Sequence, residues 1–272
     1  MEALRQVDDW PVDRAAVGVA TAGGRVETRG EGHAEFPWAS VTKLATALAA
    51  LVAAEEGSIN LDEPAGPPGS TIRHLLAHAS GLPPDAGAPI AKPGTRRIYS
   101  NAGFETLADA VGQRAEMPFS DYLRQAVLEP LDLSAVLEGS PASGLRGSLD
   151  ALLRLGRELL SPTLVAEETL GEATAVAFPG LVGVLPGYGR MEPNDWGLGF
   201  ELRDAKEPHW TGNRNSPRTF GHFGQSGSFL WVDPVAGLAC ACLSDRPFGD
   251  WAKTAWPRFS DAAVAEATGA GT

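Results

Sequence analysis

Patterns typical of β-strands lie at both ends of this chain, and helical patterns lie between them. Residues 15–29 read as two short strands joined at Gly23-Gly24. Three more strands are expected at residues 218–223, 227–233 and 238–243. Because separate strands need a shared sheet to bury their apolar faces, we predict one antiparallel sheet of about five strands, built from both chain ends.

The middle of the chain is expected to be mainly helical. Helical patterns cover residues 40–56, 72–78, 118–128, 148–160 and 166–173, another begins after Asn101, and a last one covers about 251–267. We therefore predict an α+β, α/β/α sandwich-like fold. In it, residues 1–36 and 199–272 form a sheet-containing lobe flanked by terminal helices, and residues 37–198 form a mainly helical lobe. The active site is expected in the cleft between the lobes.

Composition narrows the classes of function. The net charge of −12 and the absence of a Lys/Arg block argue against nucleic acid and anionic membranes as partners. The longest apolar stretch is too short to span a bilayer, and the N-terminus does not read as a signal peptide. The two cysteines, Cys240 and Cys242, are poorly placed to pair with each other. These features predict a cytoplasmic protein, and the sequence leaves its oligomeric state open.

A serine and a lysine three residues apart, Ser40 and Lys43, begin the most apolar helical segment. Residues at this spacing share a helix face, so a lysine base could activate the serine hydroxyl as a nucleophile. The helix N-terminus also offers positive potential for an oxyanion. The alternative is that Ser40 only caps the helix. Sixteen serines and four lysines make about 0.24 chance matches, so the motif alone is weak.

Two further motifs follow in order. Tyr99 and Asn101 share one side of an extended loop, where a phenol could relay a proton and an amide could orient a substrate. Alternatively, Asn101 caps the next helix and Tyr99 is a half-buried aromatic. Later, His222-Phe223-Gly224 ends a predicted strand and could equally be a surface histidine beside a hairpin glycine. The conjunction of all three motifs favours an active site.

Two other patterns match functional motifs only in part. His74 and His78 are spaced as zinc ligands can be on a helix, but the H-E-x-x-H pattern is absent. The segment around Ser226 resembles a nucleophile elbow, but its spacing differs from G-x-S-x-G and no helix follows it. We therefore expect neither a metal nor a cofactor.

With these motifs the chain resembles the serine β-lactamase and DD-peptidase superfamily, most of all its class C β-lactamase-like and family VIII esterase-like branch. The resemblance covers about residues 15–245 and includes Glu129-Pro-Leu131, Trp196-Gly-Leu-Gly199 and Gly221-His-Phe-Gly-Gln-Ser-Gly227. It implies that Ser40 is the acylated nucleophile, Lys43 its proton acceptor and Tyr99 the proton relay, with the base being Lys43 or Tyr99.

The resemblance also assigns substrate-binding positions. Asn101 would orient the acyl side, and the backbone N–H groups of Ser40 and Gln225, which follows Gly224, would form the oxyanion hole. His222 would occupy a position where lactamases usually carry a lysine that binds the drug's carboxylate. The bulky Phe223 is expected to narrow the cleft. Five aromatic residues are candidates for the walls of an apolar acyl pocket, with the hydrophobic core as the alternative: Trp38, Tyr188, Trp196, Trp210 and Phe223.

We therefore expect a serine hydrolase of the esterase or amidase type, acting on a small ester, amide or lactam. A penicillin-interacting DD-peptidase or weak β-lactamase is the alternative within enzymes. A non-catalytic binding module that retains the cleft is the alternative from another class.

Overall fold

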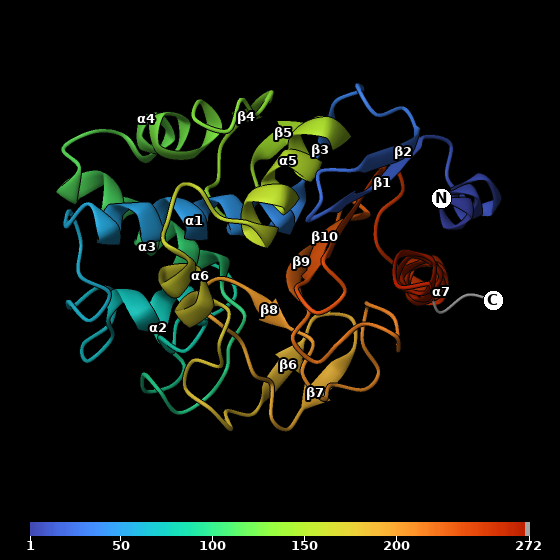
Figure 1. Cartoon of the computed structure of the whole chain (residues 1–272). Coiled ribbons are helices and arrows are strands. Elements are labelled where there is room, and N and C mark those ends of the chain that lie inside the picture. Colours follow the sequence, from blue (N-terminus) through green and yellow to red (C-terminus); the bar gives the residue numbers. More distant parts are fainter. Residues whose placement is uncertain (270–272) are drawn as a thin grey trace.

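The computed structural model describes residues 1–269 and contains a six-stranded antiparallel sheet at its centre (Figure 1). The strand order is β2-β1-β11-β10-β9-β8. Strands from the two chain ends meet where β1 pairs with β11. The predicted α+β fold and the sheet built from both chain ends are therefore confirmed. The strands are β1 (Ala15–Thr21), β2 (Val26–Gly30), β8 (Glu201–Leu202), β9 (Phe220–Gly224), β10 (Ser228–Asp233) and β11 (Leu238–Ser244).

Helices cover both faces of this sheet. Helix α5 (Leu149–Leu160) packs on β1, β10 and β11 from one side. On the other side lie α7 (Asp250–Ala267) and the short 3₁₀ helix η1 (Glu2–Asp9), which Figure 1 places together beside the two chain ends. Side chains alternate between the faces of a strand, so β9 sends His222 and Phe223 in opposite directions. The catalytic residues proposed below lie on the side away from α7.

The second layer of structure surrounds α1 (Thr42–Glu55), whose residues from Thr42 to Ala53 are all buried. A helix that is apolar all round lies in a protein interior, and this one packs on α3, α4 and strand β9. The helices around it are α2 (Ile72–Leu76), α3 (Asn101–Arg114), α4 (Phe119–Leu123), a π-helical turn η3 (Arg124–Leu128) and α6 (Glu167–Ala173). The predicted helical segments are present, with shifted ends.

Several short strands were not predicted. A three-stranded sheet has the order β3-β5-β4, with β3 (Phe36–Pro37), β4 (Ala135–Leu137) and β5 (Leu145–Gly147). A hairpin of β6 (Gly183–Leu185) and β7 (Gly189–Met191) lies between α6 and β8, where no strand was predicted. The sheet has six strands rather than about five because the two-residue β8 extends its edge.

Cys240 and Cys242 both lie on β11 as free, fully buried thiols. Each belongs to the hydrophobic cluster under α7, so the two point to the same face as their spacing predicts. Over residues 1–269, the structure has no helix with the length and apolar character required to cross a membrane.

Candidate active site

Ser40 sits in a short 3₁₀ turn, η2 (Ala39–Val41), directly before α1. The preceding residue, Ala39, has φ of 46°, a region that non-glycine residues rarely occupy and that is typical of strained functional positions. The Ser40 side chain is half-buried and does not cap α1, because Val41 is the N-cap residue and no side chain caps it. Its hydroxyl is instead contacted by Lys43 and Tyr99.

The Lys43 side chain is fully buried and belongs to the second residue of α1, one turn after Ser40. Its Nζ lies 3.5 Å from Ser40 Oγ, 2.7 Å from Asn101 Oδ1 and 2.9 Å from the carbonyl oxygen of Ala142. Burial lowers the pKa of this amine to about 7, although the carboxylates of Glu105 and Asp85 oppose the shift. A substantial fraction of Lys43 is therefore neutral near neutral pH.

The contacts of Lys43 define what a neutral amine would do there. It has two N–H donors and one lone pair, and the two oxygen acceptors of Asn101 and Ala142 take both donors. The lone pair is then left for the Ser40 hydroxyl, the third partner of Nζ. This arrangement can accept the hydroxyl proton as the serine oxygen attacks a carbonyl carbon.

The Tyr99 hydroxyl donates a hydrogen bond of 2.7 Å to Ser40 Oγ. Burial raises the pKa of the phenol, more than the hydrogen bond to Ser40 lowers it. Tyr99 is therefore protonated at neutral pH and can donate a proton. Ser40 Oγ accepts from Tyr99, accepts from Lys43 when the amine is charged, and can donate to Lys43 when the amine is neutral. Lys43 Nζ also lies 4.7 Å from the centre of the Tyr99 ring.

Asn101 is the first residue of α3, and the capping role falls to Ser100, whose Oγ accepts from the Gly103 N–H at 2.9 Å. This leaves the Asn101 amide free for the site. Its Oδ1 faces Lys43, and its Nδ2 lies 3.4 Å from Asp85 Oδ1. Asp85 is an exposed carboxylate that the sequence analysis did not select.

His222 is almost fully buried on β9, beside the rings of Tyr99 and Trp196 at 5.7 and 5.5 Å between centroids. Its Nδ1 donates to the Phe223 carbonyl at 2.6 Å, which fixes the tautomer. Burial, assisted by the charge of Lys43, lowers the pKa of His222 to about 3. The imidazole is therefore neutral and differs in charge from a lysine at this position.

Gly224 and Gln225 lie where β9 turns toward β10. A side chain at Gly224 would overlap the Trp38 carbonyl, so glycine permits this close approach of the strand to the segment before Ser40. The hydroxyls of Ser226 and Ser228 tie the same turn to the carbonyls of Pro37 and Trp38. Ser226 is thus a tether between these segments, and Gln225 is exposed beside it.

The structure separates the aromatic candidates. Trp196 and Tyr188 form a small cluster with Tyr99. Trp38 is fully buried, and Trp210 and Phe223 belong to the cluster under α7. The expectation that Phe223 narrows the cleft is wrong, because strand alternation points it away from His222 and into that cluster.

Two features near the site could not be expected from motifs. The Ala142 carbonyl oxygen, a main-chain acceptor, contacts Lys43. His78 packs its ring 4.8 Å from Tyr99 and 4.7 Å from Trp196, and its Nδ1 accepts the Ser100 N–H. It lies beyond the end of α2 with φ of 54°, so His74 and His78 do not share a helix face. Across residues 1–269, no group of three His, Cys, Asp or Glu side chains is arranged to hold a metal.

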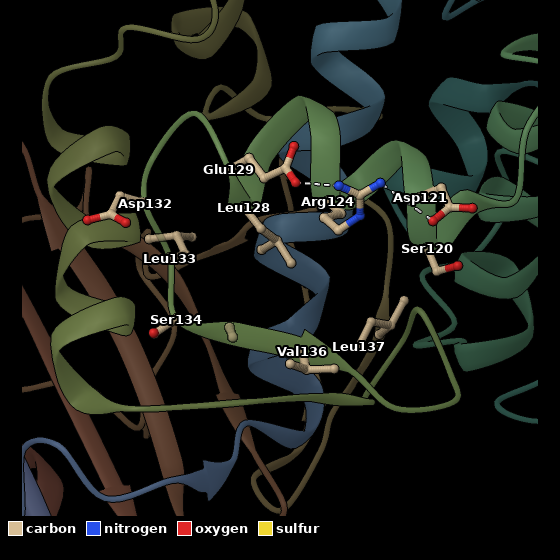
Figure 2. A pocket seen from close by; sticks show the side chains of 11 residues that line it. Ser120, Asp121, Arg124, Leu128, Glu129, Asp132, Leu133, Ser134, Val136 and Leu137 are labelled. Atoms are coloured by element: carbon tan, nitrogen blue, oxygen red, sulfur yellow. Dashed lines mark hydrogen bonds and ion pairs between the residues drawn. The ribbon is translucent and has the colours of Figure 1, made fainter.

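A groove of about 450 Å³ lies elsewhere, between β4 and the helical turns before it (Figure 2). Within it Arg124 contacts both Asp121 and Glu129, and the fourth charged residue, Asp132, pairs with Arg154 outside the groove. None of Ser40, Lys43 and Tyr99 lines this groove. The groove is therefore separate from the cluster around Ser40.

Comparisons with known proteins agree with this geometry. A solved β-lactamase from Mycobacterium bovis is 52% identical, with a TM-score of 0.96 over 98% of this chain and 99% of that one. Simvastatin synthase from Aspergillus terreus is 17% identical (TM-score 0.78, 97% of each chain), and EstCE1, a hydrolase with promiscuous acyltransferase activity, is 18% identical (TM-score 0.76, 97% of each chain). These two likenesses show the fold. A search of the curated proteins found no match.

The family model described as Beta-lactamase matches residues 6–264, nearly the whole chain. The match includes Ser40, Lys43, Tyr99 and His222, and it confirms the resemblance noted from the sequence motifs. The chain therefore belongs to the beta-lactamase family.

Proposed function

We propose that this protein is a serine hydrolase that acts through an acyl-enzyme on small esters or amides, as a carboxylesterase or amidase. The observation that carries the proposal is the contact of one serine oxygen with both a buried amine and a half-buried phenol. Membership of a family whose members are usually serine hydrolases supports it, as does the fold shared with EstCE1.

The proposed mechanism begins with Lys43 as the general base. Neutral Lys43 accepts the proton of Ser40 as Oγ attacks the substrate carbonyl carbon, and the backbone N–H groups of Ser40 and Gln225 stabilise the oxyanion. Tyr99, which is protonated, supports the serine oxygen and gives a proton to the leaving group. A water molecule then attacks the acyl-serine ester and gives a proton to the Tyr99 oxygen. Lys43 returns its proton to Ser40 Oγ, and the acid is released. The lowered pKa of Lys43 and the raised pKa of Tyr99 favour this division of roles.

Asn101 and His222 are proposed as substrate-facing groups, with Gly224 permitting the close packing of the turn that carries Gln225. The neutral His222 provides no positive charge for a substrate carboxylate, which favours neutral acyl substrates over carboxylate-bearing drugs. We also propose the cleft between the sheet-containing and helical lobes as the site, a cytoplasmic location, and no nucleic-acid, membrane or cofactor requirement.

A β-lactam substrate is the second candidate, because the 52% identical structure is described as a β-lactamase. Turnover of nitrocefin, measured beside p-nitrophenyl acetate and butyrate, separates the two. The proposal expects the esters to have the higher kcat/KM by at least about tenfold. Faster nitrocefin turnover would assign the protein to the lactam-hydrolysing group instead.

The acyl-enzyme itself is tested with a fluorophosphonate probe, which reacts covalently with activated serine hydroxyls. Mass spectrometry of the tryptic peptides should place the label on Ser40, and Ser40→Ala should abolish labelling and hydrolysis. Ser226→Ala is the matched control, because the hydroxyl of this nearby serine hydrogen-bonds to the Pro37 carbonyl and Ser228 Oγ, and the variant should still be labelled at Ser40. An unlabelled wild-type protein that still binds acyl esters would favour a non-catalytic binding module.

A further inference from the structure

A group of buried charges lies next to the proposed site without a part in the proposed chemistry. Glu201 on β8, Lys206 and His209 are each at most 5% exposed. The Glu201 carboxylate accepts from Lys206 Nζ through Oε1, and from His209 Nε2 and Trp210 Nε1 through Oε2, both at 2.9 Å. Every oxygen of this carboxylate is therefore satisfied by a buried donor.

Stability alone is a poor explanation for this network. Burying two charges costs a desolvation free energy that their mutual attraction often does not offset. Well-packed apolar residues at such positions frequently give the same stability or more. The Glu201 carboxyl is nevertheless ionised, because burial raises its pKa less than Lys206 and His209 lower it. Because stability does not explain this buried ion pair, we looked to the residues that the pair holds in position.

Lys206 connects the network to the proposed site through Trp196. Its Nζ donates to the carbonyl oxygen of Asp195 at 2.7 Å, which fixes the backbone directly before Trp196. The same ammonium lies 5.8 Å from the centre of the Trp196 ring, within the range of a cation–π contact. One cation thus holds both the backbone and the ring face of this tryptophan.

The Trp196 ring in turn packs against the residues around the nucleophile. Its centroid lies 5.5 Å from that of His222 and 6.0 Å from that of Tyr99, the residue whose hydroxyl donates to Ser40. Glu201 is also connected to His222 through the backbone, because it pairs in the sheet with Gly221, the residue before His222. The network therefore joins the β8–β9 edge of the sheet, visible in Figure 1, to the loop that carries Trp196.

We propose that Lys206, held by Glu201, is a positioning residue for acylation: it presses Trp196 against Tyr99 and so keeps the Tyr99 hydroxyl on Ser40 Oγ. This inference rests on the proposed serine-hydrolase function and adds a structural support to it. Catalytic groups displaced by about 1 Å can lose roughly 100-fold in rate. Loss of the support is therefore expected to lower the rate of acylation and to leave ester binding nearly unchanged.

The test uses Lys206→Met and the double variant Glu201→Gln/Lys206→Met. The single variant leaves a carboxylate without its main partner and should lower both Tm and kcat. The double variant removes both charges, so its Tm should recover toward wild type. Its kcat for p-nitrophenyl butyrate and its second-order rate of fluorophosphonate labelling should stay at least about tenfold below wild type, with KM changed less than about threefold.

Glu158→Gln is the matched control. Glu158 is also a buried carboxylate, 4% exposed, and it accepts hydrogen bonds from Thr163 and Leu164 at the end of α5. It does not contact the residues around Ser40, so this variant should lose stability while kcat stays within about twofold. The pH at which activity rises, which Lys43 sets, should be the same in every variant.

Two results would overturn the proposal. One is a double variant in which kcat and the labelling rate recover together with Tm. The other is a Lys206→Met protein whose kcat, measured well below its Tm, falls no more than that of Glu158→Gln. A wild-type Ser40 that resists the probe would instead refute the proposed function, so the two failures are distinguishable.

Discussion

Replacing Lys43 by methionine should change how the stability of this protein depends on pH. The folded-state pKa of about 7 lies below the 10.5 of an exposed lysine. Between these values the unfolded chain binds a proton that the folded protein has released. Stability therefore increases as pH rises through this window, and the full penalty of burying the charge is present below pH 7.

The size of the effect follows from the shift. Each pH unit on the full slope is worth about 1.4 kcal/mol, and the folded Lys43 is still half protonated at pH 7. The free energy of unfolding of the wild type should thus gain about 2 kcal/mol between pH 7 and pH 9 relative to Lys43→Met. Methionine is close to lysine in length and does not titrate, so the other ionisable groups cancel in this difference.

Urea denaturation at pH 7, 8 and 9 measures the free energies, with Lys253→Met as the control. Lys253 is exposed and pairs only with Asp250 at the surface, so its removal should leave the pH dependence unchanged. The same shift predicts that kcat/KM of the wild type rises with pH to a plateau, with its midpoint near 7. Parallel stability curves for wild type and Lys43→Met would mean that the folded protein keeps this lysine charged, and the mechanism would then lose its base.

Three further predictions concern other parts of the molecule. Tyr99→Phe should lower kcat by about 10²- to 10³-fold with an unchanged circular dichroism spectrum, since it removes only the proton donor; an unaffected rate would exclude the phenol from the mechanism. Cys240 and Cys242 are buried and burial raises the pKa of both thiols, so a thiol reagent should modify neither in the native protein and both in urea. Gly199→Ala should destabilise the fold by about 2–4 kcal/mol in urea titrations, because Gly199 has φ of 91° and a side chain there would overlap Ala47. A near-neutral result would show that this loop can move away from α1.

The sequence predicted the elements whose pattern is local. Helix α1 and the three C-terminal strands are long enough for apolar periodicity or strand propensity to appear within them. Strand β8 has two residues, and β3 pairs with β5 more than a hundred positions away. Strands this short form because the rest of the fold places their pairing partners beside them. The β-propensity of the local sequence therefore does not predict them.

The candidate site shows the same division. The grouping of Ser40, Lys43, Tyr99 and Asn101 could be predicted from motif spacing because the proposed chemistry depends on their side-chain types. The Ala142 carbonyl could not, since every residue has one and only the fold selects it. The capping residue of α3 could not be predicted either, because Ser100 and Asn101 are both good capping residues and only in the folded protein does Ser100 take the role.

The direct pairing of β1 with β11 has a consequence for the synthesis of the protein. Thr21 faces Leu238, so the central strands of the sheet join segments more than two hundred residues apart. A nascent chain cannot form this pairing until β11 has left the ribosome, and β9, which carries His222, depends on the same late strands. Helices around α1 can form earlier, but the part of the proposed site that the sheet supplies can form only when translation is nearly complete. Shortened chains that stop before Leu238 should therefore expose α1 and aggregate rather than retain partial activity.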